Sequence, residues 1–578
     1  MKKIITTVVL LALIAVVSIV IITEIKADRK APGTDTMTLA EFYGIDENKT
    51  LFFIDNKVYK KEGVFVDGHP YMDLESVQTL FNHRFFWSAD EKLLVLTTPT
   101  QVIQITPGEK QILVNDKKKK LDFAPAQFAE KELYISIEYL AGHADMTYSI
   151  FTDPNRVIID QTWGDYLFST VKEKTQVRTE RDVKAPIIKE LEVGDKLRYI
   201  DRGGIVENGF VKVMTEDGVR GFVTAEFLSE GYNEEIRGKG QLPEYTHIRH
   251  GGPVFLGWEM LYSSDSKSTL LHDLEIAPEL NVVSPSWFNV KNADGEITSI
   301  ASQSYMEAAA DQGVKVWAMI KNDSIEGGFK CTEDSHKVLS KFASRHTLIE
   351  NIMNAAEEYG LDGINVDFEM LQTETGVYYI EFLRELSVAC RKAGITLSVD
   401  NYVPAPYNAF YDLKEQGEIV DYVVIMGYDE HYNGSEESGS VASLPWFGDA
   451  IDNTVKVVNP DQVVMAIPFY TRLWKEIDQS DGSVSVSVAA TPDMKTAKET
   501  LAAYGVEPEW DEETGQYYGE YTSKGARYRM WLEEEESLTR KVTLIGNAGL
   551  AGVAAWRLGY ERPGIWETVT TVYDDSIQ

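Results

Sequence analysis

Carboxylic and amide side chains alternate along the segment LDGINVDFEM, residues 361–370. Asn365, Asp367 and Glu369 are two residues apart, so they would share one face of a β-strand, while the residues between them are apolar. Because an unpaired buried charge is costly, we expect this polar face to line a cavity rather than a packed core. Two neighbouring carboxyl groups in a cavity are suited to acid–base chemistry, and a buried ion pair is the alternative interpretation.

The segments around these acids have the pattern of a parallel α/β barrel. Residues 345–359 place apolar side chains at helical spacing, and Gly360 is a typical helix end. The acids therefore follow a helix and come at the C-terminal end of a strand, where such barrels carry their chemistry. We predict eight barrel strands, at Pro253–Leu261, Asn281–Val290, Val314–Ile320, Gly363–Glu369, Ile395–Tyr402, Asp421–Asp429, Gln462–Tyr470 and Leu550–Gly559.

The chain is too long for one hydrophobic core, so several domains are expected. We predict a (β/α)8 barrel at residues 245–572, of the TIM type, with a small α+β insertion at about 475–540. Residues 38–163 and 166–231 contain short alternating strands and are predicted to form two small β-rich domains. The first of these shows a loose internal duplication.

An apolar run opens the chain. Ile4 to Ile22 is a stretch of 19 uncharged residues that follows Lys2 and Lys3. This length favours an uncleaved transmembrane helix within residues 1–26 over a signal peptide. We therefore expect a protein of the cell membrane with its catalytic domain outside, and a secreted protein if the segment is cleaved.

The charge balance and the histidines exclude other classes of ligand. The formal net charge of −35 makes nucleic acid an improbable partner, because phosphate binding requires the opposite sign. The nine histidines show no paired spacing typical of a metal site, so we expect neither a metal nor another cofactor.

Four motifs in the predicted barrel carry a family resemblance. DGINVDFE, at residues 362–369, resembles the DGxDxDxE signature of family 18 glycoside hydrolases, the chitinase-like barrels. MGYD at 426–429 and MAIPFYTR at 465–472 resemble the family's sixth and seventh strand motifs, with Ala and Thr replacing two glycines of the latter. Trp556 matches the tryptophan of the eighth strand.

The resemblance implies a substrate-assisted retaining mechanism, in which the acetamido oxygen of the substrate acts as the nucleophile. Glu369 would be the general acid and then the base, Asp367 would orient the acetamido group, and Tyr428 would donate its hydroxyl to that group's oxygen. The implied substrate contacts are Asn365, Asp429, Trp556, Tyr470 and Arg472. The substrate would carry an N-acetylated sugar at the bond that is cleaved.

Asn365 departs from the family pattern, in which the middle position is usually Asp. In the family that Asp can share a proton with the next one, and two close carboxylates raise one pKa. Asn365 cannot ionise, although it could donate an amide hydrogen bond to Asp367. We therefore expect Asp367 and Glu369 to titrate more independently here.

The N-terminal regions bear on the choice of substrate. Residues 38–163 resemble the amine-oxidase N-terminal-like domain of bacterial surface proteins, without the spacing of copper ligands. Residues 166–231 resemble a bacterial Src-homology-3-like barrel, which would bind cell-wall peptide or glycan or would serve as a spacer. Together with the Asn365 variant, which is common in peptidoglycan-acting and spore-cortex members, they favour β-N-acetylglucosaminidase action on peptidoglycan. Chitin oligomers as substrate, and a lectin without turnover, are the alternatives.

Overall fold

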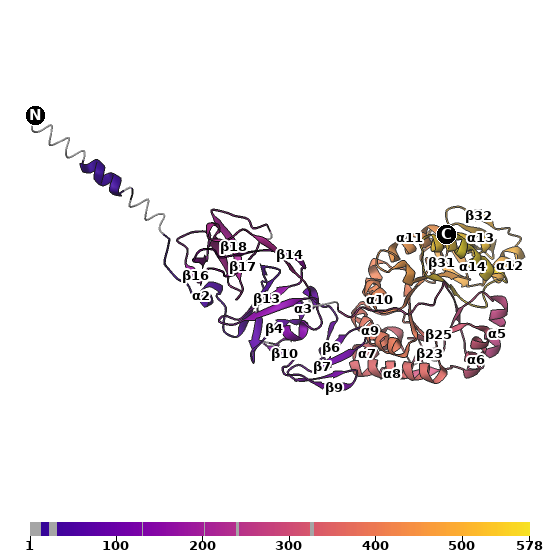
Figure 1. Ribbon diagram of the computed structural model, residues 1–578. Coiled ribbons are helices and arrows are strands. Elements are labelled where there is room, and N and C mark those ends of the chain that lie inside the picture. Colours follow the sequence, from indigo (N-terminus) through magenta and orange to yellow (C-terminus); the bar gives the residue numbers. More distant parts are fainter. Residues whose placement is uncertain are drawn as a thin grey trace, which may run out of the picture. The chain divides into compact units, whose positions relative to one another are not determined.

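A computed structural model of the chain describes residues 13–21, 23, 32–129, 131–201, 203–238, 242–323 and 329–577. These residues form two compact units, one made of residues up to Phe85 and Gln104–Leu242, the other of Phe86–Ile103 and the chain from Pro243 onward (Figure 1). Among the described residues, no helix is both long and apolar enough to cross a membrane. Much of the predicted anchor, residues 1–12, 22 and 24–26, lies outside them.

The second unit contains a closed barrel of eight parallel strands. In barrel order these are β21 (Val254–Glu259), β22 (Val282–Pro285), β25 (Lys315–Lys321), β26 (Gly363–Asp367), β27 (Thr396–Tyr402), β28 (Tyr422–Met426), β29 (Val463–Pro468) and β35 (Gly552–Trp556). Pairing of β22 with β25 and of β21 with β35 closes the ring. The predicted barrel is confirmed, because each of its strands falls within or overlaps one of the eight predicted ranges. A short pair, β23 (Phe288–Val290) and β24 (Ile297–Ser299), extends from β25.

Helices lie around these strands in Figure 1. They are α5 (Lys267–Ile276), α6 (Gln303–Gln312), α7 (Cys331–Ser340), α8 (Phe342–Tyr359), α9 (Gly376–Ala393), α10 (Leu413–Ile419), α11 (Leu444–Thr454), α13 (Glu535–Asn547) and α14 (Ile565–Ser576). The strands are buried on both faces, which explains their continuous apolar runs. As predicted, the helix before β26 ends at Gly360, whose φ of 69° suits a residue without a Cβ.

The insertion between β29 and β35 is a five-stranded antiparallel sheet with one helix. Its members are β30 (Leu473–Asp478), β31 (Val484–Ala490), α12 (Met494–Ala503), β32 (Glu509–Asp511), β33 (Gln516–Ser523) and β34 (Ala526–Leu532). Leu501 and Met530 are among the buried residues of a separate small core. Glu476 of β30 accepts hydrogen bonds from Arg527 and Arg529 of β34 and so ties two of the strands together.

Residues 86–103, which contain most of β5 (Phe85–Ser88) and all of β6 (Leu93–Thr97), pack on the barrel's helices. The Glu91 carboxylate accepts the backbone N–H of Phe342 at the start of α8 at 2.7 Å, and the Thr97 hydroxyl donates to Glu381 of α9 at 2.9 Å. The Phe86 ring makes an edge contact with Tyr378, with centroids 5.8 Å apart. This segment is therefore part of the barrel's packing although it precedes the barrel by some 140 residues in sequence.

The first unit contains two β-sheets and, apart from these, the antiparallel pair β8 and β9. One has the order β10-β11-β4-β3-β1-β13-β12, with β2 paired to β1, and the other has the order β16-β15-β19-β18-β17-β14-β20. The internal duplication is visible in the first sheet, where β4 and β11 each lead into a short helix and pair with each other. The bounds are α2 (Leu39–Tyr43), β1 (Lys49–Ile54), β2 (Lys57–Val58), β3 (Gly63–Val66), β4 (His69–Asp73), α3 (Leu74–Leu80), β7 (Val102–Ile105), β8 (Gln111–Val114), β9 (Lys117–Lys120), β10 (Ala126–Ala129), β11 (Glu132–Ser136), α4 (Ile137–Leu140), β12 (Thr147–Phe151), β13 (Arg156–Asp160), β14 (Gly164–Thr170), β15 (Thr175–Arg178), β16 (Ile187–Leu191), β17 (Lys196–Tyr199), β18 (Phe210–Thr215), β19 (Arg220–Thr224) and β20 (Tyr232–Ile236).

Candidate active site

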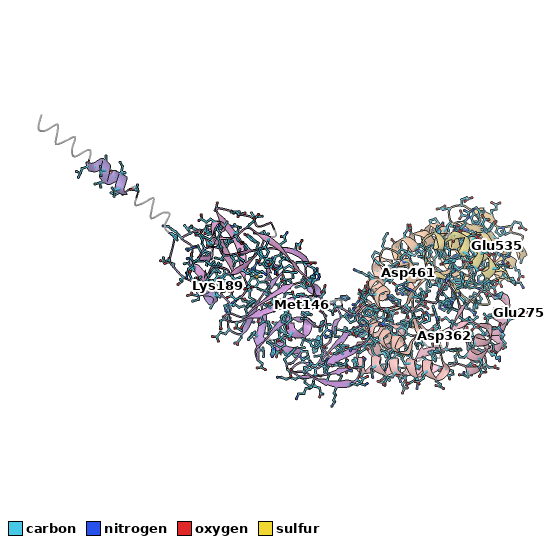
Figure 2. All side chains as sticks on the ribbon, viewed as in Figure 1. Met146, Lys189, Glu275, Asp362, Asp461 and Glu535 are labelled. Carbon is cyan, nitrogen blue, oxygen red and sulfur yellow. The ribbon has the colours of Figure 1, made fainter. Side chains whose placement is uncertain are left out.

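A cavity of about 330 Å³ opens at the C-terminal ends of the barrel strands. This is the end opposite Asp362, labelled in Figure 2, which precedes β26 and accepts the backbone N–H of Val316. The cavity is lined by Trp258, Met319, Asp367, Glu369, Asp400, Tyr402, Met426, Tyr428, Asp429, Tyr470, Arg472, Thr491, Trp556 and Tyr560. It therefore brings together every predicted site residue except Asn365.

Asn365 lies below the cavity and is fully buried in a polar layer of the barrel. Its Oδ1 accepts hydrogen bonds from the indole N–H of Trp258 at 3.0 Å and from the Ser284 hydroxyl at 2.9 Å. Its Nδ2 donates to Ser398 Oγ at 3.0 Å and to Asp400 Oδ1 at 2.8 Å. The predicted bond from Asn365 to Asp367 is therefore wrong, because β27, in register with β26, takes both amide hydrogens. Asn365 does not line the cavity, so the predicted direct contact with substrate is not supported either.

Asp367 ends β26 and lines the cavity, and one of its carboxylate oxygens has no hydrogen-bond partner among the described residues. Its Oδ1 is buried and accepts no hydrogen bond from the described residues. Burial, together with the nearby carboxyls of Glu369 and Asp400, raises the pKa of Asp367 well above its ordinary value. This group therefore retains a proton more readily than a solvated Asp.

Glu369 follows the end of the strand and also lines the cavity. Burial raises its pKa, and the negative charge of Asp429 raises it further, whereas a hydrogen bond from Tyr402 lowers it. A carboxylic acid whose pKa is shifted towards neutrality can be protonated at working pH and can donate that proton to a leaving group.

Asp429 is held by two side chains from the loop that follows β29. The Tyr470 hydroxyl and Arg472 Nη2 both donate to Asp429 Oδ1, each at 2.5 Å. Arg472 Nε also donates to the backbone oxygen of His431 at 3.1 Å. This clamp fixes a carboxylate at the cavity wall, and it joins the sixth and seventh strand motifs that the sequence singled out.

Aromatic rings form the apolar part of the cavity. Trp556 ends β35 and its ring lies 6.0 Å from that of Trp258, centroid to centroid. Tyr428 follows β28 and makes an edge contact with Tyr470, with centroids 6.0 Å apart. A sugar ring could stack on the indole, with its polar substituents directed at the carboxylates and hydroxyls.

Sequence reasoning missed several residues of the site, of which Asp400 is the most important. In β27 the alternation that identified Asn365, Asp367 and Glu369 also places Ser398, Asp400 and Tyr402 on one face, so the signal was present. Asp400 is buried, and its pKa is raised strongly by burial, with the Asn365 amide acting against that rise. No group of three or more His, Cys, Asp or Glu side chains in the described part of the chain is arranged to hold a metal ion.

Comparisons with known proteins agree with this geometry. The family described as glycosyl hydrolases family 18 matches residues 260–561, and the copper amine oxidase N-terminal domain matches residues 53–159. The uncharacterized glycosylase YvbX of Bacillus subtilis is 27% identical over 290 residues, which are 48% of this chain and 80% of that protein. The cortical fragment-lytic enzyme of Bacillus anthracis is 24% identical over 299 residues, 50% of this chain and 67% of that protein.

A solved structure shares the fold. The crystal structure of the C-terminal domain of a putative chitinase from Desulfitobacterium hafniense superposes with a TM-score of 0.50 and 21% sequence identity, over 57% of this chain and all of that one. The match to the family covers more than half of the chain, and the strand-end carboxyls lie in one cavity of a closed barrel. The chain therefore belongs to the glycosyl hydrolases of family 18 and is a glycoside hydrolase.

Proposed function

We propose that the protein cleaves β-1,4 bonds after N-acetylglucosamine in cell-wall peptidoglycan, with retention of configuration and with the substrate's acetamido group as nucleophile. The observation that carries this proposal is the buried Asp367 Oδ1, which has no partner among the described residues. An unsatisfied buried acceptor costs about 1–3 kcal/mol, and a donor supplied by the substrate would remove that cost. The N–H of an acetamido group is such a donor.

Each step of the reaction then has a group in the cavity. Glu369, whose pKa is raised by burial, protonates the glycosidic oxygen as the bond breaks. Asp367 holds the acetamido N–H, so that the acetamido oxygen attacks the anomeric carbon and forms an oxazolinium ion. Tyr428 donates its hydroxyl to the acetamido oxygen. Glu369, now ionised, removes a proton from the incoming water, which attacks the anomeric carbon from the face that the leaving group left. The bond to the acetamido oxygen breaks, and Glu369 is again the acid.

The remaining residues bind the sugar. Trp556 supports the ring at the bond that is cleaved, and Asp429, held by Tyr470 and Arg472, accepts hydrogen bonds from the sugar's hydroxyls or acetamido group. Asn365 acts from below, through Asp400, rather than by contact with substrate. Stacking on an indole with hydrogen bonds at the edge of the ring suits a glycan.

The choice of peptidoglycan over chitin is supported by the relatives. The name cortical fragment-lytic enzyme describes lysis of cortical fragments by the Bacillus anthracis protein, whose match covers half of this chain. A probable endochitinase of Caenorhabditis elegans is 21% identical over 251 residues, so chitin oligomers remain the second candidate substrate.

The test uses the full chain, because residues 86–103 pack on α8 and α9 and a fragment that starts at the barrel would lose them. Purified peptidoglycan and chitin oligomers are each incubated with the protein, and the new reducing ends are identified by mass spectrometry after borohydride reduction. Reduced N-acetylglucosamine from peptidoglycan, absent with Glu369→Gln, is the expected result. Reduced N-acetylmuramic acid would contradict the proposed bond, and cleavage of chitin alone would select the second candidate. Binding without turnover of either would leave a lectin.

The N-terminal regions complete the proposal. The apolar run Ile4 to Ile22 would anchor the protein in the cell membrane with the barrel outside. Residues 166–231, which resemble a Src-homology-3-like barrel, would bind the wall. Resistance of the membrane-bound protein to alkaline carbonate, and its digestion by protease added to intact cells, are the expected results. Release by carbonate, or protection from the protease, would contradict the anchor or its orientation.

A further inference from the structure

The proposed general acid is held by a side chain that the catalytic motifs do not include. Asn322 follows the last residue of β25 and is 1% exposed. The backbone N–H of Glu369 donates to Asn322 Oδ1 at 2.9 Å, and Asn322 Nδ2 donates to the backbone oxygen of Glu369 at 2.8 Å. The same Nδ2 donates its other hydrogen to Ser335 Oγ of α7 at 2.9 Å. The amide therefore binds both peptide groups of one residue.

A primary amide is well suited to make this contact with a single side chain. Asn and Gln carry an acceptor and a donor side by side, whereas a carboxylate only accepts and an ammonium only donates. The short Asn side chain has only two torsion angles, and the fully buried Ser335 fixes the amide's second hydrogen. The amide is thus held in one orientation with all of its hydrogen-bonding groups in use.

The backbone at Glu369 needs such a partner because it has left the sheet. The last pair in the register of β25 with β26 is Lys321 with Asp367, so the residues that follow have no strand neighbour on this side. Met370 has a φ of 54°, in the left-handed region, so the chain turns directly after the acid. Its N–H donates to the Tyr402 hydroxyl at 3.1 Å, and the Tyr411 hydroxyl donates to the backbone oxygen of Phe368 at 3.2 Å.

We propose that Asn322 is a positioning residue for the general acid, which sets the place of the Glu369 carboxyl by holding both groups of its peptide. This inference rests on the proposed function of Glu369 and adds a residue outside the family's motifs. If the peptide groups of Glu369 could reorient, the proton on its carboxyl would no longer be aligned with the glycosidic oxygen. Misplacement by about 1 Å can reduce a rate by roughly 100-fold.

Acid catalysis has a signature that a general loss of structure does not share. A sugar alkoxide is a poor leaving group, so a sugar departs readily only when its oxygen is protonated. A nitrophenolate is a good leaving group and departs without a proton. If Asn322 aligns the acid, its removal will slow the first reaction far more than the second. A merely structural role would slow both reactions alike, or would raise KM for both.

The experiment compares two substrates in the full chain. Asn322→Ala is assayed on a tetramer of the glycan that the wild-type protein cleaves, peptidoglycan or chitin, and on the 4-nitrophenyl glycoside of the disaccharide of the same glycan that ends in N-acetylglucosamine. We expect kcat for the tetramer to fall roughly 30–100-fold with KM changed by less than about threefold, and kcat for release of nitrophenol to fall less than about fivefold. Asn322→Asp, of nearly the same shape but without the N–H donor, is used if the alanine variant does not fold, and the same selective loss is expected.

Asn281→Ala is the matched control. Asn281 also binds backbone in both directions, accepting the N–H of Phe255 at 2.9 Å and donating to the oxygen of Pro253 at 2.8 Å, but at the N-terminal end of β21. Its loss should leave the ratio of the two kcat values unchanged. Equal losses on both substrates with Asn322→Ala, or no loss on either, would overturn the positioning role. A Glu369→Gln variant that still cleaves the tetramer at the wild-type rate would instead overturn the proposed function.

Discussion

Replacing Asn365 by Asp tests the polar layer beneath the cavity. The present side chain donates to Ser398 at 3.0 Å and to Asp400 at 2.8 Å, and it is fully buried. Asn365→Asp keeps both acceptor contacts but removes both donors. A proton on the new carboxyl can replace the donor to Asp400, so at acid pH we expect a loss of about 1–2 kcal/mol in the free energy of unfolding.

The loss should grow as pH rises. Burial and the neighbouring Asp400 will raise the pKa of the new carboxyl above its value in the unfolded chain, which is about 3.9. The folded state then binds more protons than the unfolded state, so stability is greatest below the unfolded pKa and falls as pH rises towards the folded one. Within that window the loss increases by about 1.4 kcal/mol for each pH unit.

The assay is urea unfolding followed by tryptophan fluorescence at pH 5, 6 and 7, with the variant compared to wild type at each pH. The titrations of the groups that the two proteins share then largely cancel. Asn547→Asp, an exposed change at the end of α13, serves as the control and should differ from wild type by less than about 0.5 kcal/mol at every pH. A stability difference for Asn365→Asp that does not change between pH 5 and pH 7 would refute this account of the layer.

Three further substitutions test the charges around the barrel. Asp429→Asn removes a negative charge that raises the pKa of Glu369, so the alkaline limb of the kcat/KM profile should move to lower pH; an unmoved limb would contradict Glu369 as the acid. Glu385→Gln leaves the fully buried Arg345 without its 2.8 Å ion pair and should cost about 3–5 kcal/mol in urea unfolding, whereas a loss below 1 kcal/mol would show that the pair contributes little. Burial raises the pKa of Glu259 to about 9, so it is neutral at pH 7 and Glu259→Gln should cost less than about 1 kcal/mol there. Between pH 7 and pH 9 the wild type should lose stability relative to this variant, because the folded state holds the proton that the unfolded state releases.

The barrel and the composition of its cavity could be predicted because they depend on local patterns. Alternation along one buried strand identified the acids of β26, and resemblance to the family's motifs identified the residues at the ends of β28, β29 and β35. The side chains at those ends meet in one cavity since the strands are parallel. Which atoms bind one another could not be predicted in the same way. The hydrogen bond from Asn365 to Asp400 depends on the register of two strands, and the register cannot be predicted from the sequence of either strand alone.

Contacts between segments that are distant in the sequence could not be predicted for a related reason. Asn322 sits in a sequence, AMIKND, that has no catalytic pattern, and its function depends on the turn that the chain makes after Glu369. Residues 86–103 read as part of an N-terminal domain, which also matches the amine oxidase family across 53–159, yet Thr97 donates to Glu381 of the barrel. Such packing depends on the complementary surfaces of two folded elements and leaves no periodicity in the sequence.

Position 365 is Asn where the family usually has Asp, so we expected Asp367 and Glu369 to titrate more independently. The structure gives a reason to expect otherwise. Ser398 of β27 is the register partner of Asn365, so Asp400, two residues further along, lies on the same inward face near Asp367. The pKa of Asp367 is therefore raised by burial and by three carboxyls, Glu369, Asp400 and Asp323. A carboxyl absent from β26 is thus present on the adjacent strand, and the Asn365 amide connects it to the layer below the cavity. Asp367 therefore lies beside other ionisable groups although position 365 cannot ionise, so we do not expect Asp367 and Glu369 to titrate independently.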